Sequence, residues 1–193
     1  MPRRTTKSFK LEVEFERKPL TPGQERRLLK LALDRAPKEI EEWRQAQTEE
    51  ERFYASPQAA VAAFNLGEYD LARELAEQSL TLSQSFKEHW NYGNALHYAH
   101  TAMGLLALRS GDLPQAAREL AMSGRTPGSP QLRSFGPTMQ LAKAMLKVGV
   151  AEPVLEYFQQ CRAFWTVGGK WIDVWERKVR RGLVPNFFMH SYR

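Results

Sequence analysis

The sequence has one cysteine, Cys161, in 193 residues, so the chain cannot form an internal disulfide. It has no run near the roughly 20 apolar residues that a membrane-spanning helix needs. Charged residues directly follow the basic first ten residues, where a signal peptide would have an apolar segment. These absences favour a cytoplasmic protein, without membrane contact, that folds around a hydrophobic core.

Signatures of catalysis are also absent. The sequence has no phosphate-binding glycine loop, no dinucleotide-binding glycine pattern and no nucleophile elbow. Cys161 lies on an apolar helical stretch, where a free cysteine is usually a core residue rather than a nucleophile. His97 and His100 stand three apart on a predicted helix, but a metal site needs further ligands. We therefore expect no enzyme, no cofactor and no metal site; a helical enzyme without a recognisable motif stays open.

The charge is unevenly distributed along the chain. Residues 1–10 carry a net charge of +4 and residues 162–193 a net charge of +5, whereas residues 11–161 carry −3. Basic ends of this kind are either solvated termini or electrostatic contacts for nucleic acid or acidic partners.

Prolines predict where the first helices begin. Thr21-Pro22 is expected to begin one helix and Pro37 to begin a second, because proline is favoured in the first helical turn. Ser56-Pro57 is expected to begin the next helix, with Ser56 as its N-cap. These starts predict an N-terminal helical pair over residues 21–55.

Three glycines mark an internal repeat. Gly67, Gly111 and Gly149 are separated by 44 and 38 residues, and each lies between two apolar helical stretches. A small or β-branched residue follows each glycine five positions later: Ala72, Ala116 and Val154. Glycine supplies the positive φ that ends a helix, and the small residue allows the next helix to pack closely. The sequence therefore predicts three helical hairpins.

The middle hairpin resembles a tetratricopeptide repeat, with Gly104, Ala107, Gly111, Ala116 and Leu120 at the expected spacing. The resemblance extends over about residues 54–165, although the spacing exceeds the family's period of about 34 residues. It implies a helical repeat array that binds other proteins.

Glycine and proline dominate residues 123–137, which we expect to form a long loop. The loop is either a recognition element or a spacer in which Leu132 and Phe135 pack into the core. Beyond it, a helix over 152–165 and a last helix over 171–181 are expected. Trp171, Trp175 and Val179 should form the apolar face of this terminal cap, and the tail after Gly182 should pack back onto the body.

The segment Phe9–Phe15 alternates apolar and charged residues, which is a strand pattern. No other part of the sequence offers an obvious partner strand. An unpaired strand exposes its backbone polar groups, so the arm either lies in a groove of its own helices or pairs with another strand. We expect it to pair across a homodimer or with a partner.

Together these observations predict an all-α fold: a tetratricopeptide-like array of three helical hairpins with an N-terminal helical pair, a C-terminal capping helix and one short strand-like N-terminal arm. The arm occupies residues 1–20, the helical pair 21–55, the hairpins 56–165, and the cap and tail 166–193.

The preferred function is binding of a partner peptide or protein in the concave groove. In the tetratricopeptide family the first helix of each hairpin lines that groove, and three cations fall there: Arg109, Lys143 and Lys147. We expect these cations to be exposed and to meet the acidic groups of a protein or peptide. The resemblance assigns partner binding to Asn65, Asn94, Tyr98, Arg109, Lys143 and Lys147.

The alternative is a nucleic-acid-binding protein that uses its basic ends. Its phosphate contacts would be Arg3, Arg4, Lys7, Arg177, Lys178, Arg180 and Arg181. Binding to phosphates weakens steeply with salt, whereas a groove with apolar anchors responds far less.

Overall fold

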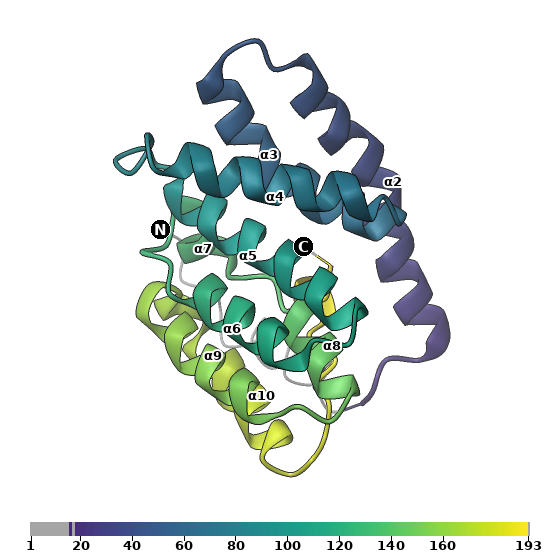
Figure 1. Cartoon of the computed structure of the whole chain (residues 1–193). Helices are drawn as coiled ribbons and strands as arrows, with labels where there is room; N and C mark the ends of the chain where they lie inside the picture. Colours follow the sequence, from purple (N-terminus) through teal and green to yellow (C-terminus); the bar gives the residue numbers. More distant parts are fainter. Residues whose placement is uncertain (1–15, 17, 193) are drawn as a thin grey trace.

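The computed structural model describes residue 16 and residues 18–192 and is all-α over that range, as predicted (Figure 1). The α-helices of this range are α2 (Pro22–Gln45), α3 (Glu49–Leu66), α4 (Tyr69–Ser83), α5 (Tyr92–Arg109), α6 (Leu113–Gly124), α7 (Pro130–Phe135), α8 (Gln140–Lys147), α9 (Glu152–Phe164) and α10 (Gly169–Val179). Two short 3-10 helices follow α9 and α10, namely η1 (Thr166–Gly168) and η2 (Phe188–His190). Within the described range no helix has the length and apolar character to cross a membrane.

The three predicted glycine turns are present and share one geometry. Gly67, Gly111 and Gly149 have φ of 84°, 83° and 83°, the left-handed conformation that favours glycine. In each turn the residue after the glycine donates its N–H to a carbonyl five residues earlier, as from Glu68 to Ala63 at 2.9 Å. The turns join α3 to α4, α5 to α6 and α8 to α9. The residues five positions after each glycine, Ala72, Ala116 and Val154, are fully buried.

The predicted helix starts at Pro37 and Ser56-Pro57 are wrong. Helix α2 runs through Pro37, and α3 begins at Glu49 and runs through Pro57, so the expected N-terminal pair is one long helix followed by the first helix of the hairpins. Thr48 caps α3 in a reciprocal capping box with Glu51, which provides a stronger start than Ser56. Burial of side chains on both helices offsets the free-energy cost of the backbone hydrogen bond that each interior proline removes.

The predicted loop at 123–137 is also partly helical. Helix α6 extends to Gly124, and α7 forms behind Ser129, whose hydroxyl accepts a hydrogen bond from the Leu132 N–H at 3.0 Å. Leu132 is buried, as a spacer requires, but Phe135 is 55% exposed. The segment therefore anchors one side chain in the core and presents another at the surface.

Small side chains form the core between α2, α3, α4 and α5. Nine of its thirteen buried members are alanines, and α2 packs on α3, α3 on α4 and α4 on α5. Alanine lets helix axes approach closely. Contacts between the helix backbones therefore add to the contacts between side chains in this half of the molecule.

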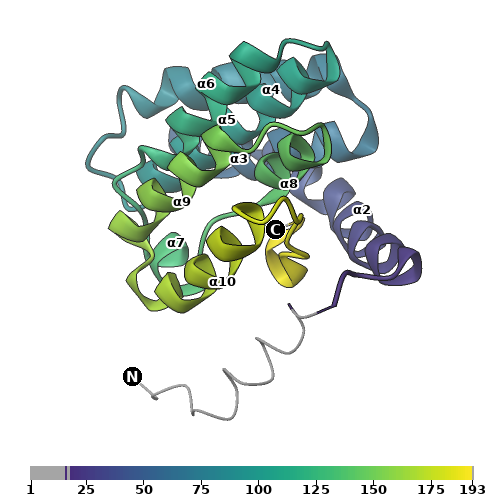
Figure 2. The same cartoon turned by 90° about the horizontal axis from the view of Figure 1, so that it is seen from below.

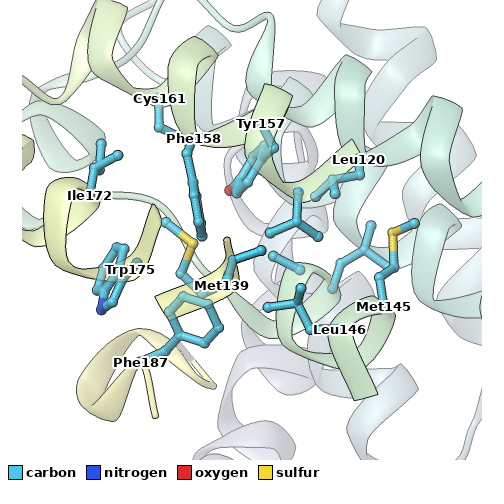
Figure 3. Packing of buried hydrophobic residues seen from close by; sticks show 14 of the residues in the cluster. Leu120, Met139, Met145, Leu146, Tyr157, Phe158, Cys161, Ile172, Trp175 and Phe187 are labelled. Atoms are coloured by element: carbon cyan, nitrogen blue, oxygen red, sulfur yellow. The ribbon is translucent and has the colours of Figure 1, made fainter. Parts of the chain in front are cut away.

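Large side chains form the second core, between α5, α6, α8, α9 and α10 (Figure 3). Trp171, Trp175 and Val179 of α10 are buried against this core, so the last helix has the apolar face predicted for the cap. Phe187 of the following segment is fully buried beside Trp175, at 5.1 Å between ring centroids. The tail thus packs back onto the body as predicted.

The C-terminal segment lies between α10, α8 and α2, as seen from below in Figure 2. The His190 carbonyl accepts a hydrogen bond from the Met139 N–H at 2.7 Å, and the Tyr192 carbonyl accepts one from Arg35 at 3.0 Å. The C-terminal segment therefore bridges α2 and the residue that precedes α8. The predicted Phe9–Phe15 strand, with its homodimer contact, lies outside the described residues.

Candidate partner-binding site

Two of the predicted groove cations form an internal ion-pair cluster. Lys143 is only 5% exposed, and its Nζ lies 2.8 Å from Oε1 of Glu25 and 3.3 Å from the Asn186 carbonyl oxygen. Lys147 lies 3.2 Å from the other oxygen of Glu25. Partial burial opposes ionisation of Glu25, yet the two lysines lower the pKa of this carboxyl. The expectation that Lys143 is exposed is wrong, because it joins α8 to α2 and to the C-terminal segment.

The other predicted residues do not meet at one place. The Arg109 guanidinium stacks on the Tyr69 ring, 3.9 Å from its centroid. The Asn65 side-chain oxygen accepts a hydrogen bond from the Gln140 amide at 2.6 Å. Asn94 and Tyr98 line a common cleft, which none of the other four predicted residues lines.

This cleft, which we call the aromatic cleft, has a volume of about 310 Å³. Three of its aromatic side chains are largely exposed: Tyr54 of α3 at 50%, Trp90 before α5 at 45% and Phe135 of α7 at 55%. Its lining within the described range carries no charged residue. The lining residues are Tyr54, Gln58, Trp90, Asn91, Asn94, Tyr98, Gln131, Leu132, Phe135 and Gly136.

Amides form the polar part of the aromatic cleft. The buried Asn94 donates to Asn91 Oδ1 at 2.7 Å and to Gln131 Oε1 at 3.3 Å, and it accepts a hydrogen bond from the Ser129 hydroxyl at 2.6 Å. These bonds connect α5 to α7 and hold the floor rigid. The side-chain oxygen of Gln58 is buried, and no described residue donates a hydrogen bond to it.

Sequence reasoning missed Tyr54 and Trp90 as neighbours and left Phe135 open between a recognition loop and the core. Tyr54 and Trp90 pack edge to face at 5.5 Å between ring centroids, although 36 residues separate them in the chain. The one available signal was the density of aromatic and amide residues in 89–98, a stretch without any lysine, arginine or acidic residue.

His97 is a structural residue of the core. Its Nδ1 lies 3.0 Å from the Ser123 carbonyl oxygen, and its Nε2 accepts the Thr138 N–H at 3.1 Å. This pair of contacts requires a neutral ring protonated on Nδ1. Burial lowers the pKa of His97 to about 4. His100 instead pairs with Glu119 at 2.7 Å, and no cluster of three or more potential metal ligands occurs in the described part of the chain.

The buried histidine predicts a loss of stability in acid. Between about pH 6.5 and pH 4 the unfolded chain binds a proton at this histidine and the folded chain does not, so stability falls as the pH falls. From pH 7 to pH 5 this linkage should remove about 2 kcal/mol from the free energy of unfolding. Urea unfolding of the wild type and of His97→Gln at both pH values measures it. An equal pH dependence of the free energy of unfolding in the two proteins would contradict the assignment of His97 as a buried, neutral histidine.

Cys161 is a core thiol, as the sequence indicated. It is fully buried, and burial raises its pKa, so the thiolate needed for nucleophilic attack does not form at neutral pH.

The cations of the alternative nucleic-acid surface are partly engaged. Lys178 lies 2.9 Å from Glu16, and Arg180 lies 2.8 Å from Glu176. Arg177 and Arg181 are exposed. Arg3, Arg4 and Lys7 lie outside the described residues. Two of the four predicted contacts on and after α10 therefore already have an acidic partner.

Comparison with protein-family models, with curated proteins and with solved structures gave no significant match to this chain.

Proposed function

We propose that this chain is a tetratricopeptide-like array of three helical hairpins that binds a peptide segment of a partner protein in the aromatic cleft. The three left-handed glycine turns with one hydrogen-bond pattern support the repeat assignment. The observation that carries the function is the group of three exposed aromatic rings around a cleft floored by amides. A cytoplasmic location is part of the proposal and rests on the one unpaired Cys161.

The cleft suits an extended peptide with apolar anchors. Tyr54, Trp90 and Phe135 offer large apolar surfaces, and aromatic residues of this kind carry much of the energy in protein interfaces. Because Asn94 and Gln131 are already fixed by their hydrogen bonds, the floor loses little freedom on binding.

The acidic partner expected from the sequence has less support than this apolar anchoring. Of the three cations in that expectation, Lys143 and Lys147 share the single carboxylate of Glu25, and the exposed Arg109 stacks on Tyr69. At the buried Lys143 a partner carboxylate would have to displace Glu25, which joins α2 to α8.

Selection from a random peptide library displayed on phage, with the full chain as bait, tests the proposal. Selected peptides should bind the wild type with a measurable Kd in fluorescence anisotropy. The double variant Trp90→Ala/Phe135→Ala should bind the same peptides at least about 30-fold more weakly, a loss of about 2 kcal/mol for the two rings together.

The matched control is Leu31→Ala/Val148→Ala, which removes two exposed apolar side chains outside the cleft lining, on α2 and at the end of α8. This control should leave the Kd unchanged. Failure to select any peptide, or equal affinity for the wild type and the Trp90→Ala/Phe135→Ala variant, would overturn the proposed function.

A further inference from the structure

A second hollow, which we call the acidic hollow, lies beside the aromatic cleft. It has a volume of about 720 Å³ and is formed by the end of α2, the start of α3 and the segment before α5. Tyr54 and Trp90 line both spaces, so the two form one continuous surface. The residues that line the acidic hollow are Glu42, Gln45, Ala46, Thr48, Glu50, Glu51, Tyr54, Ala55, His89 and Trp90.

The charges around the acidic hollow have one sign. Its lining includes three carboxylates and, within the described range, no lysine or arginine. Glu51 is committed to the capping box, where it accepts the N–H groups of Gln47 and Thr48 at 2.7 Å and 3.0 Å. Glu42 and Glu50 therefore provide the carboxylates that a ligand can reach.

The existing partners of these two carboxylates are weakly held. Glu42 lies 3.5 Å from Lys38 on the same helix face, and both side chains are more than half exposed. Glu50 lies 3.3 Å from His89 and is 66% exposed. The Lys38–Glu42 pair is solvent-exposed and contributes little to stability, so a cationic ligand can replace it at small cost. His89 is only 18% exposed, but Glu50 keeps most of its own surface open to a ligand.

Tyr54 and Trp90 add a second feature that favours a cation. They pack edge to face, and each keeps about half of its surface exposed. The face of an aromatic ring attracts a cation, and tryptophan and tyrosine are the strongest such rings. A guanidinium group can stack on such a ring while its N–H groups reach a carboxylate.

We infer that the acidic hollow binds an arginine or lysine side chain of the partner peptide whose apolar residues occupy the aromatic cleft. The inference rests on the proposed function and adds a charge requirement to it. The groove cations indicated an acidic partner, whereas the acidic hollow requires a basic one. The basic side chain would lie on Tyr54 and Trp90 with its charged end toward Glu42 and Glu50.

Peptides selected on the full chain provide the test. They should carry an arginine or lysine at a fixed distance from their apolar residues. Replacing that residue by citrulline, the neutral isostere of arginine, should weaken binding about tenfold or more. The Glu42→Gln/Glu50→Gln variant should weaken binding of the arginine peptide by a similar factor and leave binding of the citrulline peptide nearly unchanged.

The control variant is Glu41→Gln/Glu49→Gln, which removes the same charge from the same two helices at positions outside the hollow. It should change the affinity less than twofold. Anisotropy titrations of the three proteins at low and physiological salt give all the constants, and the arginine preference should shrink as salt rises.

The outcomes separate the two proposals. If peptides depend on Trp90 and Phe135 but carry no basic residue, or if Glu42→Gln/Glu50→Gln matches its control, the cation site is overturned and the peptide-binding function stands. If no peptide binds, or if none depends on those two rings, both fall.

Discussion

A Glu16→Gln variant should lose about 3–5 kcal/mol of its free energy of unfolding, the cost typical of removing one member of a buried ion pair. Glu16 is 1% exposed, and both of its carboxylate oxygens are fully used. Oε1 accepts hydrogen bonds from Trp175 Nε1 at 3.0 Å and from the Phe187 N–H at 2.8 Å. Oε2 accepts from the Asn186 N–H at 3.1 Å and pairs with Lys178 at 2.9 Å.

Glutamine preserves the shape of the side chain but has only one acceptor oxygen. Its NH₂ group would face two of these donors, which would then be buried without an acceptor. The donors belong to α10 and to the C-terminal segment. Losing these hydrogen bonds would therefore weaken the attachment of α10 and of the C-terminal segment to Glu16, which precedes α2 in the chain. The large expected effect follows from four contacts made by one carboxylate.

Urea denaturation at neutral pH measures this effect. Glu77→Gln on the exposed face of α4 is the matched control and should change stability by no more than about 0.5 kcal/mol. A loss below about 1 kcal/mol in Glu16→Gln, well under the range for buried pairs, would show that Glu16 does not hold the C-terminal segment.

Replacing Gly93 with alanine should destabilise the protein by about 3 kcal/mol, although alanine normally strengthens a helix. A Cβ at Gly93 would lie 2.0 Å from the Gly128 carbonyl oxygen and 2.4 Å from its carbon, both backbone atoms. The loop cannot simply retreat, because Gly128 itself packs closely against Phe164 on its other side.

The same substitution should also reduce peptide binding. Moving the loop would break the hydrogen bond from the Thr126 hydroxyl to the Gly93 carbonyl, at 2.9 Å. It would also displace Ser129, which fixes Asn94 in the floor of the aromatic cleft. Stability and function are therefore expected to fall together in this variant.

Gly23→Ala provides a control with the opposite sign. Gly23 lies in the first turn of α2, and the nearest atom to a Cβ there is 3.9 Å away. Alanine should raise stability by about 0.4–1 kcal/mol at this position because it restricts the unfolded chain. Thermal or urea unfolding that showed Gly93→Ala to be as stable as the wild type would refute the close approach of α5 to the loop.

Local features of the fold were predictable from the sequence. The turns at Gly67, Gly111 and Gly149 depend on a positive φ within a few residues, and each carries its own signal. The buried face of α10 follows from the spacing of Trp171 and Trp175 on one helix. Pattern reasoning works here because the interacting residues are neighbours in the chain.

The prolines show where local reasoning failed. Proline favours a first turn, so Pro37 and Pro57 were taken as helix starts, yet both lie inside helices. Packing of α2 on α3 and of α3 on α4 stabilises the continuous helices by more than the prolines destabilise them. Propensity is a weak signal wherever a long buried face opposes it.

The sequence by itself determined the all-α character of the described residues, the positions of three hairpin turns, the buried face of the last helix and a buried cysteine, because these follow from periodicity and from single residues with strong local preferences. Tertiary structure alone decided which polar groups remain available to a ligand. Lys143 is neutralised by Glu25, 118 residues earlier in the chain, and the aromatic cleft combines Tyr54, Trp90 and Phe135 from three separate segments. Such long-range pairings depend on how whole helices pack, and no local pattern in the sequence encodes them.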